Sequence, residues 1–208
     1  MEITSNELKN RALNNLRAGW GNAILAFFLI GLVSQVANIV PVIGSILGLI
    51  IAGPIALGAA IFSLQFSKNE NPKAATVFDG FKNFGNALGT YILMGIIVFV
   101  FMLLLIIPGI IRAIAYSQTM YILAKNPSIS AMDALKKSRS MMDGHKLDYF
   151  ILNLSFIGWG LLCILTLGIG FLWLIPYIRI SLAHFHNELA GDEDPDVVLT
   201  NSEELLDA

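Results

Sequence analysis

Three long stretches without any charged residue constrain this sequence more than any other feature. They lie between Arg17 and Lys68, between Lys82 and Arg112, and between Asp148 and Arg179. Each is longer than the roughly 20 mainly apolar residues that a helix needs to cross a bilayer. A helix also satisfies its backbone N–H and C=O groups within one segment, which lipid cannot do for it. The sequence therefore predicts an all-α, polytopic membrane protein.

The composition favours a membrane protein over a soluble domain. Only 13% of the residues are charged and 56% are hydrophobic, whereas a soluble protein is typically about 25% charged. The first residues lack the basic-then-apolar order of a cleaved signal peptide, so we expect the first spanning helix to be retained. The single cysteine, Cys163, can form no intramolecular disulfide and is no metal motif by itself.

Six spanning helices are predicted, joined on one side by short regions marked by proline or glycine. They cover about residues 22–40, 46–66, 87–107, 110–124, 147–167 and 171–189. Pro54 lies inside the second of them, where it predicts a kink or a partly re-entrant start. The third is expected to end at Pro108-Gly109.

A more polar segment precedes the first, third and fifth predicted spans, within residues 4–18, 68–86 and 126–146. In the middle segment Ala74, Phe78 and Phe81 are expected to form the apolar stripe. The pattern predicts three parallel pseudo-repeats, each a surface amphipathic helix followed by two spans. Their approximate bounds are residues 1–67, 68–125 and 126–190. Together they would form one membrane domain, residues 1–190, followed by an acidic tail, residues 191–208.

The positions of lysine and arginine predict the orientation of the chain. Every one of them except Arg112 and Arg179 precedes the first span or lies between spans two and three or between spans four and five. The positive-inside rule assigns these regions to the cytoplasm, so both termini and the acidic tail are predicted to be cytoplasmic. The acidic residues do not oppose this, because the rule depends on lysine and arginine rather than on net charge.

The clearest amphipathic helix begins at Ser130, with Asp133 three residues later, where both favour a helix N-terminus. One face is predicted to carry Ala131, Leu135, Ser138 and Met142. The other face carries Lys136, Lys137 and Arg139, with Lys146 following. These four cations are candidates for contact with anionic lipid of the inner leaflet, each contributing about 1 kcal/mol. Alternatively they only set the topology, or the basic helix binds a partner protein.

Two arginines inside predicted spans, Arg112 and Arg179, are candidates for an anion or lipid-headgroup site. Each follows a proline by three or four residues, in equivalent places of the second and third repeats. An intramembrane arginine costs a few kcal/mol on insertion scales, so it should face a cavity, a partner or an interface. The alternatives are snorkelling to the outer surface and bonding to carbonyls freed by the proline. The uncharged polar residues in the spans are expected to form helix–helix hydrogen bonds.

No pattern in the sequence predicts a catalytic residue, a metal site or a cofactor. There is no glycine-rich phosphate loop, no G-x-S-x-G and no H-E-x-x-H. His184, His186 and Glu188 invite a metal interpretation. On a helix only His184 and Glu188 share a face, however, and a zinc site needs at least three protein ligands.

Several motifs carry a resemblance to a known family. They are Ile107-Pro108-Gly109-Ile110-Ile111-Arg112, Tyr116-Ser117, Ser138-Arg139 with Met142-Asp143-Gly144, Ser155-Phe156-Ile157-Gly158-Trp159, and Thr166-Leu167-Gly168-Ile169-Gly170 with Leu172-Trp173-Leu174-Ile175-Pro176-Tyr177. In these the chain resembles the domain-of-unknown-function 975 family, over nearly its whole length. His186 departs from the family, which often has tyrosine there. The resemblance implies a multi-pass protein of the bacterial cell membrane and supplies no reaction.

The function predicted from these features is non-enzymatic, acting through lipid or a protein partner at the cytoplasmic face. The expected partners are the lipid bilayer, anionic lipid in particular, and a membrane or cytoplasmic protein, with no nucleic acid. The alternative is a small transporter or an export or immunity component with an anion site near Arg112 and Arg179. An intramembrane enzyme ranks third, because no nucleophile–base pair can be assembled.

Overall fold

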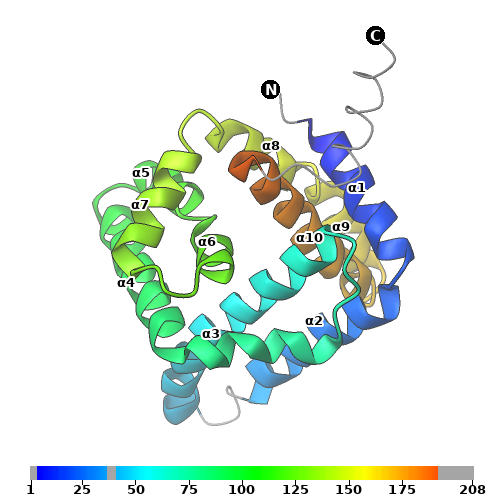
Figure 1. Ribbon diagram of the computed structural model, residues 1–208, viewed down its shortest axis with the longest axis horizontal. Coiled ribbons are helices and arrows are strands. Elements are labelled where there is room, and N and C mark those ends of the chain that lie inside the picture. Colours follow the sequence, from blue (N-terminus) through cyan, green and yellow to red (C-terminus); the bar gives the residue numbers. More distant parts are fainter. Residues whose placement is uncertain (1–3, 37–40, 192–208) are drawn as a thin grey trace.

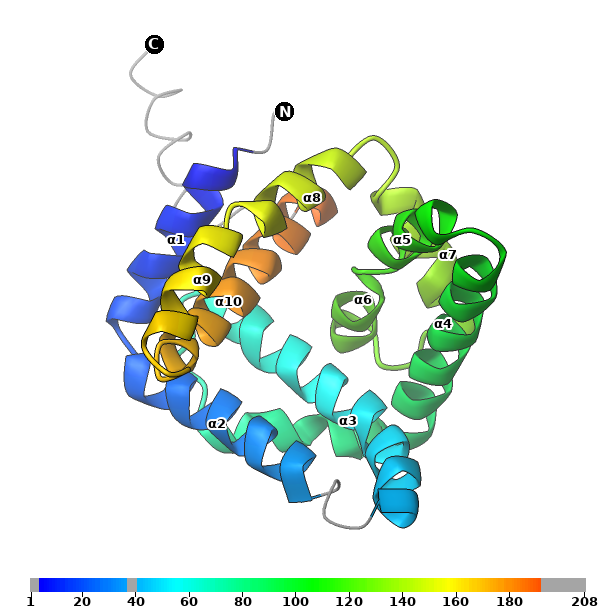
Figure 2. The same ribbon diagram turned by 180° about the vertical axis from the view of Figure 1, so that it is seen from behind.

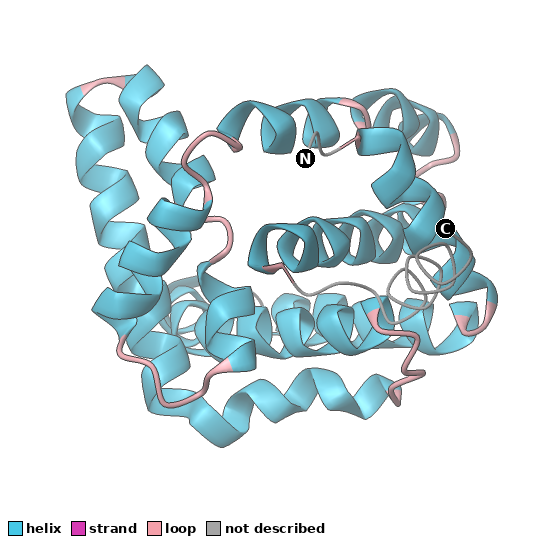
Figure 3. Ribbon diagram, turned by 45° about the horizontal axis from the view of Figure 1, so that its top comes forward, coloured by secondary structure: helices cyan, strands magenta, loops and turns pink. Residues whose placement is uncertain are grey.

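The computed structural model describes residues 4–36 and 41–191, and all the regular structure in these ranges is helical (Figures 1 and 3). The elements are α1 (Ser5–Arg17), α2 (Trp20–Val36), α3 (Pro41–Ser67), the 3₁₀ helix η1 (Ala74–Asn83), α4 (Phe84–Leu104), α5 (Ile106–Ala115), α6 (Thr119–Lys125), α7 (Ala131–Met141), α8 (Lys146–Leu154), α9 (Ile157–Leu165) and α10 (Phe171–Ala190). The predicted all-α class is confirmed for these residues. The predicted acidic tail lies outside them.

Four segments are long and apolar enough to cross a membrane. They are Leu47–Ser67, Ala74–Leu104, Ile106–Lys125 and Lys146–Leu165. A fifth is possible if α1 and α2, which are bent by 101° at Ala18-Gly19, together make one broken span. The predicted sixth span corresponds to α10, whose histidine, asparagine and glutamate residues lower its hydropathy. Helices able to span a membrane are thus present, and the number six stays a prediction.

Helix α10 lies between α1, α2, α3 and α9, whereas α4, α5 and α7 lie on the opposite side of the molecule (Figures 1 and 2). Its C-terminal half is buried almost completely, from Ile180 to Asn187. Helix α3 packs against η1, α4, α6 and α10. Helix α3 continues through Pro54 without a break. These two helices therefore bring the three predicted repeats together.

The segment before α4 packs differently from its prediction. Residues 74–83 form a 3₁₀ helix that buries Ala74, Val77 and Gly80, while Phe78 stays exposed. A 3₁₀ helix has three residues per turn, so positions three apart share one face. The rings of Phe78 and Phe81 do lie together, with centroids 6.4 Å apart. The predicted stripe of Ala74, Phe78 and Phe81 assumed an α-helical period, and it is wrong in placing the buried Ala74 on the same face as the exposed Phe78.

The third predicted span ends earlier than expected. Helix α4 stops at Leu104, and Leu105 has an extended backbone, with φ −159° and ψ 132°. Helix α5 then returns beside α4, with Gly109 packed against Met102. Pro108 falls in the first turn of α5, where the missing N–H costs nothing. The proline therefore lies inside the start of a helix rather than ending one.

Large apolar side chains are exposed on the outer faces of several helices. Leu103 and Leu104 of α4, Ile107 of α5 and Leu165 of α9 each expose about two thirds or more of their surface. Within Ala74–Leu104 and Lys146–Leu165, the apolar stretches of 18 residues that qualify these segments as spans are only 11% and 17% buried. A soluble monomer rarely exposes apolar patches of this extent. The exposed apolar faces are those expected of helices that contact lipid.

Candidate functional site

Helix α7 separates its residues as the sequence predicted. The Ser130 hydroxyl oxygen accepts a hydrogen bond from the Asp133 backbone N–H at 3.2 Å, and the hydroxyl donates to Asp133 Oδ2 at 2.7 Å. The predicted N-cap is therefore confirmed. The buried residues are Leu135, Ser138 and Met142, together with Ala134. Lys136, Lys137 and Arg139 are all exposed, and we call these three the α7 basic face.

The apolar face of α7 is covered by protein. It packs on α4 and α6, and the Ser138 hydroxyl donates to the backbone carbonyl of Ala115 at 2.9 Å. The helix therefore does not rest on lipid through its apolar side chains, as a free amphipathic surface helix would. The α7 basic face points away from the helices that carry it, and its cations are available to groups outside the chain.

Lys146 lies in a different environment from the α7 basic face. It begins α8, and its ammonium donates to Asp143 Oδ1 at 2.6 Å. This hydrogen bond, together with the positive charge of Lys146, holds the pKa of the Asp143 carboxyl below its usual value. Lys136 is more loosely paired, with Nζ 3.9 Å from Asp133 Oδ1, and its side chain is 72% exposed. The charge of Lys146 is thus more closely paired within the chain than the charge of Lys136.

Arg112 is held within the hairpin of α4 and α5. Its guanidinium carbon lies 4.4 Å from the centroid of the Phe101 ring of α4, a cation–π geometry. The side chain is half-buried. Arg112 is therefore stabilised by its own hairpin.

Arg179 lies on α10, a helix that is placed away from α5 in both views (Figures 1 and 2). Although the C-terminal half of this helix is buried, the Arg179 side chain is exposed. The Tyr121 hydroxyl of α6 donates to the backbone carbonyl of Arg179 at 3.4 Å. No carboxylate within the described ranges forms an ion pair with it. The two arginines thus have different surroundings: among the described residues neither forms an ion pair with a carboxylate, but Arg112 stacks on an aromatic ring whereas Arg179 is exposed.

A polar chain runs from α10 to the junction of α5 and α6. His186 Nδ1 and Gln118 Oε1 are 3.2 Å apart, and Gln118 Nε2 donates to Ser117 Oγ at 3.0 Å. The rings of His186 and Tyr121 are stacked with their centroids 5.3 Å apart. The predicted helix–helix hydrogen bonding is therefore confirmed for Gln118. Asn153, by contrast, donates within its own helix, to the carbonyl of Tyr149.

A second polar cluster joins α1, α3 and α10. Asn15 Nδ2 donates to the Phe66 carbonyl at 2.9 Å and lies 3.3 Å from His184 Nε2. Asn187 Nδ2 donates to Ser67 Oγ at 2.9 Å. The sequence pattern did not predict that Asn15 is buried. The one signal for it is that Asn15 directly precedes the buried Leu16 in the amphipathic helix α1.

The charged residues near this cluster are paired. Arg11 bridges Glu188 of α10 and Glu7 of its own helix, each at 2.6 Å. His184, His186 and Glu188 therefore contact three different residues, Asn15, Gln118 and Arg11. Within the part of the chain that the structure describes, no three histidine, cysteine, aspartate or glutamate side chains converge as metal ligands do. The two clusters connect helices.

The comparisons with known proteins gave one result. A family model described as "Protein of unknown function (DUF975)" matches residues 1–113 and, in a second match, residues 96–193. No curated protein and no solved structure matches the chain.

Proposed function

Because this chain belongs to the DUF975 family, whose description assigns no activity, we propose its function from its own geometry. It is a multi-pass protein of the bacterial cell membrane that acts without catalysis, by binding anionic lipid headgroups at the cytoplasmic face. The observation that carries this proposal is the α7 basic face. Lys136, Lys137 and Arg139 project together from a helix whose other side is fully occupied by α4 and α6.

The topology behind this proposal has six spans in three parallel repeats and both termini in the cytoplasm. It is supported by the distribution of lysine and arginine, which concentrates on one side of every predicted span pair. Under this topology α10 is the sixth span and the α7 basic face is cytoplasmic. Long basic side chains reach an adjacent headgroup layer even when their helix backbone lies outside it. The cytoplasmic leaflet carries the anionic lipid that such a surface attracts.

Changing Lys136, Lys137 and Arg139 together to glutamine is expected to weaken retention of anionic phospholipid by at least about tenfold, because each cation contributes about 1 kcal/mol near an anionic surface. The measurement is native mass spectrometry of the purified chain in mild detergent with added phosphatidylglycerol. The matched control changes Lys68, Lys73 and Lys82 to glutamine, which removes the same charge from the same predicted side. Equal retention in both variants would show that α7 is not the lipid surface. The basic residues of α7 would then either set the topology only or bind a partner protein.

The transporter alternative rests on one observation, the exposed side chain of Arg179, which has no ion-pair partner among the described residues, on a helix whose C-terminal half is buried. Arg112 has no comparable setting, because it stacks on Phe101. An anion site in this alternative therefore centres on Arg179 alone.

The anion-site alternative predicts that inorganic phosphate raises the unfolding temperature of the native chain and of Arg112→Gln, but not that of Arg179→Gln. A ligand that binds only the folded state stabilises it by about 2.7 kcal/mol at 100 times its dissociation constant. The measurement is thermal unfolding in detergent at constant ionic strength, with chloride as the comparison. A phosphate shift that is absent, or the same in all three proteins, would eliminate the anion-site alternative.

A further inference from the structure

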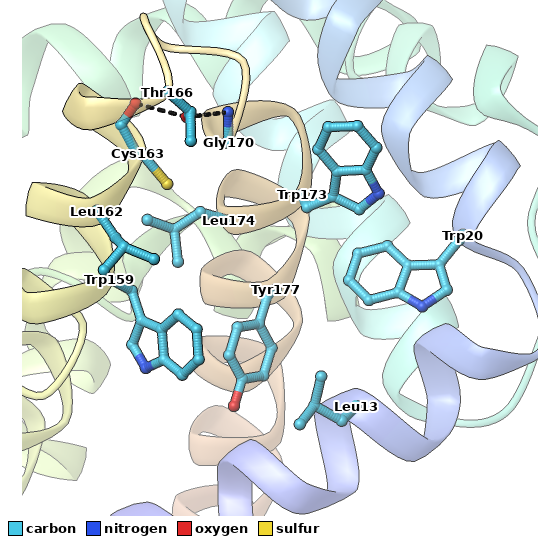
Figure 4. A pocket seen from close by; sticks show the side chains of 10 residues that line it. All are labelled: Leu13, Trp20, Trp159, Leu162, Cys163, Thr166, Gly170, Trp173, Leu174 and Tyr177. Carbon is cyan, nitrogen blue, oxygen red and sulfur yellow. Dashed lines mark hydrogen bonds between the residues drawn. The ribbon is translucent and has the colours of Figure 1, made fainter.

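All three tryptophans of the chain and its single cysteine line one pocket (Figure 4). The tryptophans are Trp20, Trp159 and Trp173, and the cysteine is Cys163. The pocket has a volume of about 300 Å³ and lies between two pairs of helices that are far apart in the sequence, α1 with α2 and α9 with α10. Neither the family description nor the function proposed above assigns it a role.

The interior of this pocket is suited to hydrocarbon. Its walls are mainly aromatic and aliphatic, with Thr166 beside Cys163 and Gly170 at one end and the Tyr177 hydroxyl toward the other (Figure 4). The Thr166 hydroxyl is already used, because it donates to the Cys163 carbonyl at 2.8 Å and accepts from the Gly170 N–H at 3.1 Å (Figure 4). A polar ligand group would therefore find no free partner at the Thr166 end. An apolar chain would lose nothing by entering.

The mouth of the pocket is continuous with the exposed apolar surface of α9. Trp159 is 57% exposed and Leu162 is 58% exposed, and both line the pocket. Both also belong to Lys146–Leu165, a segment long and apolar enough to cross a membrane. The pocket thus opens sideways, toward the surface that faces lipid in the proposed topology. Acyl chains are the molecules that surround such an opening.

A cation lies toward the α1 end of the pocket. Lys9 is one helical turn before Leu13, which lines the pocket, and its ammonium lies 4.6 Å from the centroid of the Phe156 ring. The Phe156 ring in turn packs edge-on against Tyr177, with centroids 5.3 Å apart. The Tyr177 hydroxyl points toward α1 (Figure 4) and has no hydrogen-bond partner among the described residues. The Lys9 ammonium donates a hydrogen bond to the Ser155 carbonyl at 3.3 Å and has further N–H groups for a ligand. A hydroxyl and a positive charge therefore both border the Phe156 ring, and they are groups that the ester and phosphate oxygens of a phospholipid can bind.

We propose that this pocket binds one acyl chain of a membrane phospholipid, with the phosphate near Lys9 and Tyr177. The inference depends on the membrane placement proposed above, but not on the α7 basic face. Trp20 and Leu13 come from the first predicted repeat and Trp159 and Trp173 from the third, so a bound chain would fill the seam between them.

The tryptophans report directly on this pocket, because the chain has no others. The purified protein in detergent is titrated with phosphatidylglycerol carrying brominated acyl chains, which quench tryptophan emission on contact. Saturable quenching that ends at a single lipid per chain is expected. Quenching that rises without saturation would show annular lipid only and would overturn the proposal.

Two matched pairs of variants locate the binding. Leu162→Phe narrows the pocket and is expected to weaken saturable binding, measured by quenching, by about tenfold, because the larger ring occupies space that the acyl chain would fill. Leu161→Phe, on the same helix and equally exposed but outside the pocket, should bind as the native chain does. Lys9→Gln is expected to weaken binding about fivefold and Lys9→Arg to preserve it. Equal binding by Leu162→Phe and Leu161→Phe would place the lipid elsewhere.

A second measurement uses the unaltered protein, so that it does not depend on a variant's folding. Alkylation of Cys163 by N-ethylmaleimide is expected to slow when phosphatidylglycerol is added, because the only thiol lines the pocket. An unchanged rate would contradict the proposal. The α7 glutamine variant distinguishes the two proposals. If only the pocket binds lipid, the α7 glutamine variant keeps both saturable quenching and lipid retention. If the native chain retains lipid but shows no saturable quenching, it binds lipid through α7 alone.

Discussion

Alanine at Gly58 or Gly80 is expected to destabilise the protein by about 3 kcal/mol or more, the upper end of the range for overpacking. These glycines lie where α3 and η1 touch. A Cβ on Gly58 would overlap the backbone carbonyl of Val77, and a Cβ on Gly80 would overlap the carbonyl of Pro54. The obstructing atoms belong to the backbone, so no flexible side chain can move aside. Since a native protein is stable by only about 5–15 kcal/mol, either change should compromise folding.

Thermal unfolding in detergent, followed by circular dichroism, measures this effect. Gly89→Ala and Gly95→Ala are the controls, because both lie in α4 and a Cβ on either meets nothing within 4 Å. Alanine there should be neutral or should stabilise the helix by up to about 1 kcal/mol. If Gly58→Ala and Gly89→Ala unfolded at the same temperature, the close contact of α3 with η1 would be wrong. Small residues commonly permit such close contacts between membrane helices.

The change Asn187→Asp is expected to lower the free energy of unfolding by several kcal/mol, although it replaces only the amide nitrogen of the side chain by an oxygen. Asn187 is buried and donates to Ser67 Oγ. The Ser67 hydroxyl hydrogen is already donated to the Leu64 carbonyl at 2.9 Å. An aspartate would therefore face the lone pairs of Ser67 with no donor, and a buried carboxylate without a partner costs several kcal/mol.

The same unfolding measurement tests this change, with Asn14→Asp as the matched control. Asn14 is exposed on α1, so a charge there stays in contact with solvent and the change should be within about 0.5 kcal/mol of neutral. A similar unfolding temperature for the two aspartate variants would mean that Asn187 is not buried between α10 and α3. A large difference would identify the α3–α10 contact as one that holds the first and third predicted repeats together.

The faces of the helices could be predicted where the local period was α-helical. Leu135, Ser138 and Met142 are buried as expected, and Ser130 caps their helix. The prediction was wrong for Phe78, because the segment winds as a 3₁₀ helix and Gly80 must contact α3. It also misplaced the end of the third span, because the turn forms at Leu105, a residue with no turn preference, rather than at Pro108.

The candidate site was predicted only in part, because a single helix does not show what lies opposite it. Arg112 and Arg179 occupy equivalent places in the sequence, yet one stacks on Phe101 and the other is exposed. Trp20 is far in the sequence from Trp159, Cys163 and Trp173, and all four line one pocket. The polar end of α10 suggested a metal site and instead contacts Asn15, Gln118 and Arg11.

The sequence by itself determined that the chain is helical and apolar enough for a membrane, which residues of α7 are basic and exposed, and which family it belongs to. These properties depend on composition and on neighbours within a few residues, so they can be read locally. The tertiary structure alone decided which helices approach closely enough to need glycine, which arginine stacks on an aromatic ring and which is exposed, and which residues enclose the pocket. Those properties depend on contacts between residues far apart in the chain, which are created only when the helices pack.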